Sequence, residues 1–192
     1  MGNNVEERVA QFAINWQRLS GKIMRQDLQE TLGEALSRAL EVICTGVPEP
    51  AAIIAWEPFV QDLARTVRLD CQVEWIGRRA SRANSIAAMA SADIGINVAQ
   101  WAVADTGSVA LYVTPEATLY PSLLPKQHLV LLDVADIVPT VREGLMELRK
   151  HLPQLAKIIT GPSMSADIEG QLQIGVHGPQ SVMVLLWASD RN

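Results

Sequence analysis

The stretch Ala51-Ala52-Ile53-Ile54-Ala55-Trp56 lies between Pro50 and Pro58 and contains no charged side chain. A continuous apolar run of this length, bounded by prolines, is typical of a strand that is buried on both faces. Strands of that kind belong to parallel sheets, because helices cover both sides of such a sheet. This run therefore predicts a parallel sheet, and the rest of the chain is interpreted around it.

On either side of this run, apolar residues alternate between helical and strand spacing. One helix is expected to begin at Asp27, with Glu30 as its capping-box partner, and to end before Thr45. Other helices are expected at residues 4–19, 58–68, 81–90, 98–103 and 139–151. Strands are expected at residues 22–25, 51–56, 71–76, 93–97, 108–113, 129–132, 157–160 and 181–187.

This alternation predicts βαβ units and hence an α/β fold with a mainly parallel sheet flanked by helices. The chain has 192 residues and no linker, repeat or shift in composition. We therefore expect one domain over residues 1–192, in which the helical opening, residues 1–45, packs on the core.

Composition and charge disfavour several classes of partner. The net charge of −5 and the lack of a Lys/Arg run argue against nucleic acid and a membrane surface. The polar start, Met1 to Glu7, predicts no signal peptide, and no apolar run approaches the roughly 20 residues of a membrane span. We expect a cytoplasmic protein.

The chain offers few ligands for metals. It has two cysteines, Cys44 and Cys71, whereas an iron–sulfur cluster usually needs about four thiolates. Both are expected to be buried thiols in a reducing compartment. The three histidines show no paired spacing, so no metal site is predicted.

Four segments beyond residue 100 combine glycine or proline with polar side chains near predicted strand ends. In open α/β sheets, ligands collect in the crevice beyond the carboxyl ends of the strands, so we expect a binding site there. The candidate ligand-binding residues are Asp105, Thr106, Gly107, Ser108, Ser122, Gly161, Ser163, Ser165, Asp167, Gly175, His177 and Gly178.

Two of these residues are candidates for catalysis. His177 lies between glycines, and the pKa of a histidine is suited to proton transfer at neutral pH. Asp105 is the second candidate, although the stretch 104–108 also fits a tight turn. His128 and His151 lack such surroundings and are expected to be structural.

The third segment, residues 161–169, has a structural alternative. Gly161-Pro162 predicts a sharp turn, after which Ser165 can cap a short helix with Asp167 in its first turn. The pattern G-x-S-x-G is absent, so hydrolase chemistry is disfavoured.

The four segments together resemble the LutC/YkgG family of LUD-domain proteins over roughly residues 92–187. The resemblance is carried, in order, by Ala104-Asp105-Thr106-Gly107-Ser108-Val109, Ser122-Leu123-Leu124-Pro125, Gly161-Pro162-Ser163-Met164-Ser165-Ala166-Asp167-Ile168-Glu169 and Gly175-Val176-His177-Gly178-Pro179.

The resemblance implies a fold like that of the NagB/RpiA/CoA-transferase group. It also implies work beside iron–sulfur subunits of the LutA and LutB type in oxidising L-lactate to pyruvate. Iron–sulfur clusters are then expected only in those partners, and this chain is expected to bind no cofactor itself.

The chain departs from the family pattern at three places. Many relatives carry an arginine shortly before the Ser-Leu-Leu-Pro segment, where this chain has residues 117–121, and a polar or basic residue where it has Met164. Both changes remove a cation that would bind a small carboxylate or phosphate ligand. The N-terminal extension of many relatives is also expected to be missing.

Three functions remain open. The first is an accessory subunit of the iron–sulfur lactate-oxidising system. The second is an independent small-molecule enzyme on the same fold, either sugar-phosphate isomerase-like or handling CoA esters. The third is a homo-oligomeric module that uses the tryptophans and the apolar stripe of residues 4–19 as its interface, although this stripe also fits packing on the chain's own core.

Overall fold

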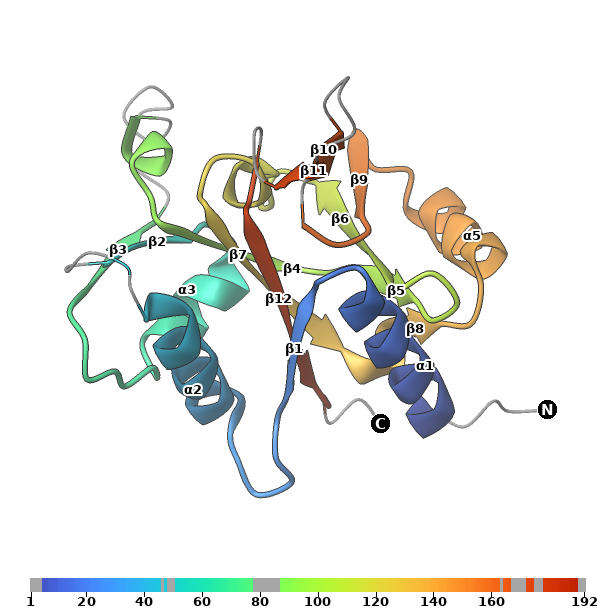
Figure 1. Ribbon diagram of the computed structural model, residues 1–192, viewed down its shortest axis with the longest axis horizontal. Coiled ribbons are helices and arrows are strands. Elements are labelled where there is room, and N and C mark those ends of the chain that lie inside the picture. Colours follow the sequence, from blue (N-terminus) through green and yellow to red (C-terminus); the bar gives the residue numbers. More distant parts are fainter. Residues whose placement is uncertain are drawn as a thin grey trace.

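The computed structural model describes residues 5–45, 47, 51–77, 87–162, 164–166, 172–174 and 178–189. Its centre is a six-stranded sheet in which every pairing is parallel (Figure 1). In spatial order, the strands are β1 (Lys22–Arg25), β12 (Ser181–Trp187), β7 (Gln127–Asp133), β4 (Ile94–Val98), β2 (Ala51–Ala55) and β3 (Val73–Ile76). The prediction of a mainly parallel sheet flanked by helices is confirmed.

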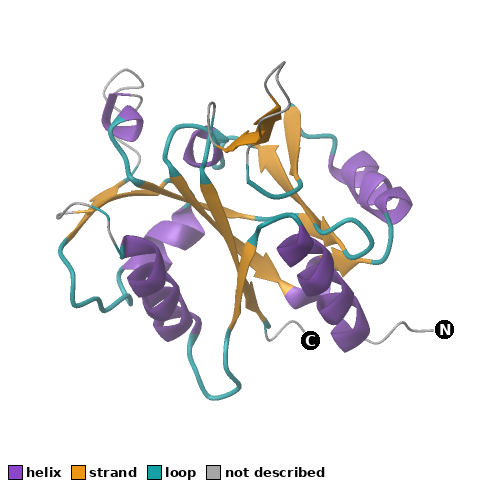
Figure 2. Ribbon diagram, in the orientation of Figure 1, coloured by secondary structure: helices purple, strands orange, loops and turns teal. Residues whose placement is uncertain are grey.

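The two faces of this sheet support two cores, because successive residues of a strand point to opposite faces. Leu129 and Leu131 of β7 pack with α2 (Leu32–Cys44) and α3 (Pro58–Ala64). Val130 and Leu132 pack on the other face, with α1 (Val5–Arg18) and a second sheet. Figure 2 shows helices on both sides of the central strands.

Helix α1 buries its apolar stripe in the core of this chain. Val9, Phe12 and Trp16 are buried, and the rings of Phe12 and Trp16 stack with their centroids 5.9 Å apart. The indole Nε1 of Trp16 donates to the carbonyl of Lys22, 2.8 Å away, which ties the helix to the start of β1. The stripe is therefore already covered, and the same side chains do not form an exposed interface.

The second sheet has four strands, in the order β8 (Ile137–Val138), β5 (Trp101–Val103), β6 (Ser108–Val113) and β9 (Leu155–Ile159). Strand β6 is antiparallel to both β5 and β9. Helix α5 (Val141–His151) covers its outer face, where Gly144 lies against the ring of Trp101. The predicted helical turn at 98–103 is wrong, because residues 101–103 pair with 108–110.

Two predictions of local structure also differ from the structure. Helix α2 begins after Thr31, whose side chain and that of Glu34 form the capping box, and the side chain of Leu28 is fully exposed in the preceding loop. The predicted helix capped by Ser165 is wrong. Residues Met164–Ala166 form β10, which pairs antiparallel with β11 (Leu172–Ile174), so cross-strand pairing holds this segment in an extended conformation.

The remaining helix predictions are close to the observed elements. Helix α3 is shorter than predicted and ends at Ala64, and residues 87–90 are helical while 81–86 lie outside the described residues. Short 3-10 turns, η1 (Tyr120–Ser122) and η2 (Val134–Asp136), flank β7. None of the described helices has both the length and the apolar character needed to cross a bilayer.

Candidate functional site

A cavity of about 590 Å³ opens at the amino ends of β7 and β12, next to the carboxyl end of β9. Its walls come from these three strands, from η1 and from two glycine-proline loops. The lining residues are Ser122, Leu123, His128, Lys157, Ile158, Ile159, Thr160, Gly161, Pro162, Gly178, Pro179 and Val182. One cation and no carboxylate are among these described residues.

The cation of the cavity is Lys157 on β9. Its Nζ donates to the backbone carbonyl of Ser122 at 2.9 Å and to the Oγ of the same residue at 3.2 Å. The hydroxyl of Ser122 in turn donates to the carbonyl of Leu119 at 2.8 Å. An ammonium has three N–H donors, so among the described residues these neutral contacts leave one of them for a ligand. Partial burial lowers the pKa of Lys157.

A row of hydrogen-bonded, buried side chains extends from the opposite end of the sheet to the cavity. Glu57, which follows β2, accepts through Oε1 from Asn97 Nδ2 at 3.0 Å and from the backbone N–H of Val98 at 3.2 Å. Asn97 Nδ2 also donates to the carbonyl of Thr118 at 3.0 Å, and its Oδ1 lies 3.2 Å from Nε2 of His128. Burial raises the pKa of Glu57 against the opposing effect of these hydrogen bonds.

These hydrogen bonds determine the tautomer of His128. The carbonyl of Thr118 can only accept, so the amide nitrogen of Asn97 must face it and the amide oxygen must face His128. His128 therefore carries its proton on Nε2 and has a lone pair on Nδ1. Burial, with a smaller contribution from the charge of Lys157, lowers the pKa of His128 to about 3, which keeps the ring neutral.

The Nδ1 atom of His128 is a buried acceptor that no described residue hydrogen bonds. His128 itself is 1% exposed and lines the cavity. A buried polar atom without a partner is unfavourable by about 1–3 kcal/mol, so native proteins rarely keep one without a reason. The cavity is thus lined by a cation and by a neutral histidine that has an unused acceptor, and these two residues suit a small anion that also carries a hydrogen-bond donor.

The position of Ser122 depends on a close approach between η1 and β4. A Cβ atom on Gly95 would lie 1.9 Å from the backbone oxygen of Pro121, so this position has no room for a side chain. Glycine therefore allows η1 to lie directly on the sheet. That contact places Ser122 beside Lys157.

The structure brings several of the predicted site residues together. Ser122, Gly161 and Gly178 all line the cavity, but at the amino ends of β7 and β12 rather than at the carboxyl ends. The buried Ser108 lies behind the wall, where its hydroxyl is 2.9 Å from that of Thr160 and 2.8 Å from that of Thr106. A hydrogen-bonded row of hydroxyls therefore leads to the cavity.

Asp105 and Gly107 lie away from the cavity, against α1. The side chain of Asp105 is exposed, and its backbone carbonyl accepts from Asn15 Nδ2 at 3.0 Å. Gly107 has φ +63°, and a Cβ there would lie 2.5 Å from the backbone nitrogen of Trp16. These contacts agree with the turn interpretation of the stretch 104–108.

The roles of the other predicted site residues stay predictions. Ser163, Asp167, Gly175 and His177 lie outside the described residues, and Ser165 is described only as part of the backbone of β10. Sequence reasoning missed Lys157 and Asn97, and it assigned His128 a purely structural role. The available signal was a polar or charged residue within an otherwise apolar strand.

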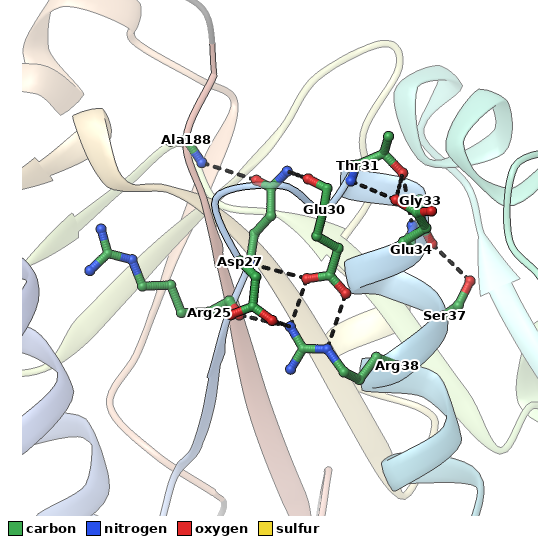
Figure 3. Close-up of polar contacts among 10 residues, drawn as sticks. Arg25, Asp27, Glu30, Thr31, Gly33, Glu34, Ser37, Arg38 and Ala188 are labelled. Atoms are coloured by element: carbon green, nitrogen blue, oxygen red, sulfur yellow. Dashed lines mark hydrogen bonds and ion pairs between the residues drawn. The ribbon is translucent and has the colours of Figure 1, made fainter.

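A second pocket, of about 890 Å³, lies at the carboxyl ends of β1 and β12. The arginines near this pocket form ion pairs with carboxylates. Arg38 contacts both carboxylate oxygens of Glu30 at 2.7 and 3.1 Å, and Arg25 contacts Glu6 at 2.6 and 2.7 Å (Figure 3 shows the Arg38 pairing). An anionic ligand would have to compete with these carboxylates, so we take the cavity at the amino ends as the candidate site.

These features define an α/β protein with a small polar cavity at the amino edge of a parallel sheet. Residues 25–187 match the LUD domain family, and the chain belongs to that family. It is 31% identical to lactate utilization protein C of Macrococcus caseolyticus over 164 residues, which are 80% of this chain and 68% of that protein. It is 29% identical to the uncharacterized protein YkgG of Escherichia coli over 153 residues, 75% of this chain and 65% of that one.

Other relatives match over a shorter region. Lactate utilization protein C of an Exiguobacterium species is 37% identical over 101 residues, which are 50% of this chain and 44% of that protein. The chain thus aligns with less than half of that relative. Among solved structures, a DUF162 family protein from Deinococcus radiodurans superimposes with a TM-score of 0.67 at 18% identity, covering 97% of this chain and all of that one. This likeness supports the fold.

Proposed function

We propose that this chain takes part in lactate utilization, as a cluster-free subunit of an iron–sulfur system that oxidises L-lactate to pyruvate. The observation that carries the proposal is the match to relatives named lactate utilization protein C, one of which aligns with 80% of this chain. The family membership of residues 25–187 supports it.

The cysteine content agrees with a division of labour between subunits. Oxidation of lactate to pyruvate releases two electrons and two protons, and the electrons need a carrier. Cys44 and Cys71 are both half-buried, rather than buried as predicted, and two thiols are fewer than the roughly four that a cluster uses. The proposal therefore assigns the clusters to partner subunits and the handling of a small polar ligand to this chain.

Affinity purification tests the subunit role. The tagged chain would be recovered under mild conditions from its native cells grown on L-lactate, and the eluate assayed for iron and for lactate-dependent dye reduction. We expect iron-containing partners and activity, and neither in an eluate from cells that express the tag alone. A solitary chain without activity would contradict the subunit role.

Growth provides an independent test of the pathway. A strain that lacks this chain should fail to grow on L-lactate but should still grow on pyruvate, the product of the proposed reaction. Normal growth on L-lactate would contradict the proposal. If the purified chain were solitary and a sugar phosphate or CoA ester raised its melting temperature, the independent-enzyme alternative would be favoured instead.

A further inference from the structure

We propose that the cavity at the amino ends of β7 and β12 binds a 2-hydroxycarboxylate, whose carboxylate pairs with Lys157 and whose hydroxyl donates to Nδ1 of His128. The site itself is inferred from geometry alone. The choice of L-lactate as the first 2-hydroxycarboxylate to test rests on the proposed function.

Lys157 is the residue that would bind the carboxylate of the ligand. Its Nζ lies in a cavity whose described lining has no acid, and its contacts at 2.9 and 3.2 Å are to the neutral oxygens of Ser122. A partly buried cation with only neutral partners favours an anion as its third contact. One point charge suits a monoanionic carboxylate better than a phosphate dianion, which is usually held by several donors.

His128 is the residue that would accept a hydrogen bond from the hydroxyl of the ligand. Its Nε2–H is bonded to Asn97, whose amide is held in one orientation by Thr118 and Glu57. The Nδ1 lone pair has no described donor, although the residue is 1% exposed. A ligand hydroxyl supplies the missing donor, whereas a ketone or an alkyl group does not.

The two contacts converge on adjacent atoms of one ligand. Lys157 and His128 line the same cavity of about 590 Å³, so one small ligand there can contact both residues. A 2-hydroxycarboxylate carries its anion and its hydroxyl on adjacent carbons. The site should therefore prefer a ligand with the hydroxyl over an analogue without it, because the analogue would leave Nδ1 of His128 buried without a partner.

Titration calorimetry on the purified full chain tests this pairing with four ligands: L-lactate, propionate, pyruvate and inorganic phosphate. We expect L-lactate to bind about tenfold more tightly than propionate or pyruvate, which lack the hydroxyl donor. Phosphate should bind more weakly than lactate. Equal affinity for lactate and propionate, tighter binding of phosphate, or no saturable binding of any carboxylate would overturn the proposal.

Two variants assign the contacts. In His128→Gln, the amide can keep a donor toward Asn97 but the Nδ1 acceptor is lost, so the lactate-to-propionate ratio should fall to about one while propionate affinity is kept. Lys157→Met should weaken both ligands at least tenfold, whereas Lys126→Met, which removes an exposed lysine outside the cavity, should change neither. A ratio that survives in His128→Gln would contradict the assignment.

NMR on the unmodified chain keeps the test independent of variant folding. Long-range ¹H–¹⁵N spectra should show His128 as the neutral Nε2–H tautomer, and L-lactate, but not propionate, should shift its Nδ1 resonance. An Nδ1–H tautomer would overturn the proposal. If the chain binds no lactate yet still copurifies with iron-containing partners, this inference fails while the proposed subunit role stands. If the chain binds lactate but purifies alone, the inference stands and the subunit role fails.

Discussion

The two edges of the parallel sheet carry opposite kinds of polar site. At the carboxyl edge, beyond β1 and β12, Arg38 and Arg25 are paired with Glu30 and Glu6, so both cations have carboxylate partners within the protein. At the amino edge, Lys157 has only neutral partners among the described residues, and Nδ1 of His128 has none. The cations of one edge thus have carboxylate partners, whereas the cation of the other edge does not, and this is where we propose that a ligand binds.

The direction of the strands alone therefore does not locate a site. The rule that ligands bind beyond carboxyl ends rests on parallel strands followed by helices. Here the second sheet packs on one face, and β9 brings Lys157 to the amino ends of β7 and β12.

Asn97→Ala should have the largest effect on stability. The substitution removes the hydrogen-bond partner of the Thr118 carbonyl and of His128 Nε2, and it leaves Glu57 with only the backbone N–H of Val98. Each orphaned buried group is unfavourable by about 1–3 kcal/mol, so we expect a loss of about 3 kcal/mol or more in the free energy of unfolding. Urea denaturation measures it, with Gln100→Ala, an exposed residue just after β4, expected to stay within about 0.5 kcal/mol.

Gly95→Ala tests the close approach that positions Ser122. Its Cβ would lie 1.9 Å from the backbone oxygen of Pro121, so η1 must move away from the sheet. Overpacking of this kind destabilises by about 1–3 kcal/mol. The matched control at the carboxyl edge is Gly77→Ala, where the nearest atom is 3.7 Å away and the effect on urea denaturation should be small. Equal effects at the two glycines would show that η1 adapts without cost.

The pH dependence of stability should report His128. Its folded pKa of about 3 lies below the unfolded value of 6.5, so the unfolded chain binds a proton that the folded chain rejects. The stabilisation is present above pH 6.5 and is lost as the pH falls toward 3. Between pH 6.5 and 5.5, the chain should lose about 1.0 kcal/mol more than His128→Gln does, since glutamine does not titrate. Parallel pH profiles for the two proteins would contradict the buried neutral histidine.

Arg38→Gln at the carboxyl edge should have the smallest effect. The guanidinium is bidentate to Glu30 and lowers the pKa of that carboxylate, but its side chain is 39% exposed. Exposed pairs contribute about 0.2–1 kcal/mol, and salt weakens them. Urea denaturation at low and high ionic strength should show the loss shrinking with salt, with Arg65→Gln, from the more exposed pair with Asp62, as a weaker reference.

The parallel sheet was predictable because two of its inner strands are continuous apolar runs. Residues 51–55 and 181–187 are buried on both faces, and this environment accepts little besides apolar side chains. Strand β5 was missed because it has only three residues and owes its extended state to β6 and β8. Short segments of this kind are decided by tertiary pairing rather than by local preference.

The start of α2 shows a related limit. Asp27 with Glu30 and Thr31 with Glu34 follow the same capping pattern, and sequence spacing does not distinguish them. The choice follows from Arg38, which reaches back from α2 and holds Glu30 in the preceding loop (Figure 3). Contacts between residues separated in sequence thus decided an apparently local question.

The candidate site was predictable only in its loops. Ser122, Gly161 and Gly178 stand out because glycine and proline mark turns next to polar residues. Lys157 and His128 lie within strands, where spacing of two tells which side chains share a face but not which strand lies opposite. The tautomer of His128 depends on Asn97 in β4 and on Glu57, which follows β2, and these residues leave no joint pattern in the sequence.

The position of β12 has a consequence for synthesis of the protein. The strand formed by residues 181–187 lies between β1 and β7, and Lys22 pairs with Met183. While the chain grows on the ribosome, β1 thus has no strand to pair with, and one edge of β7 stays unpaired until this strand emerges. Contacts so distant in sequence slow folding and leave strand edges exposed to other chains. We expect newly made chains to depend on chaperones until residue 187 has left the exit tunnel.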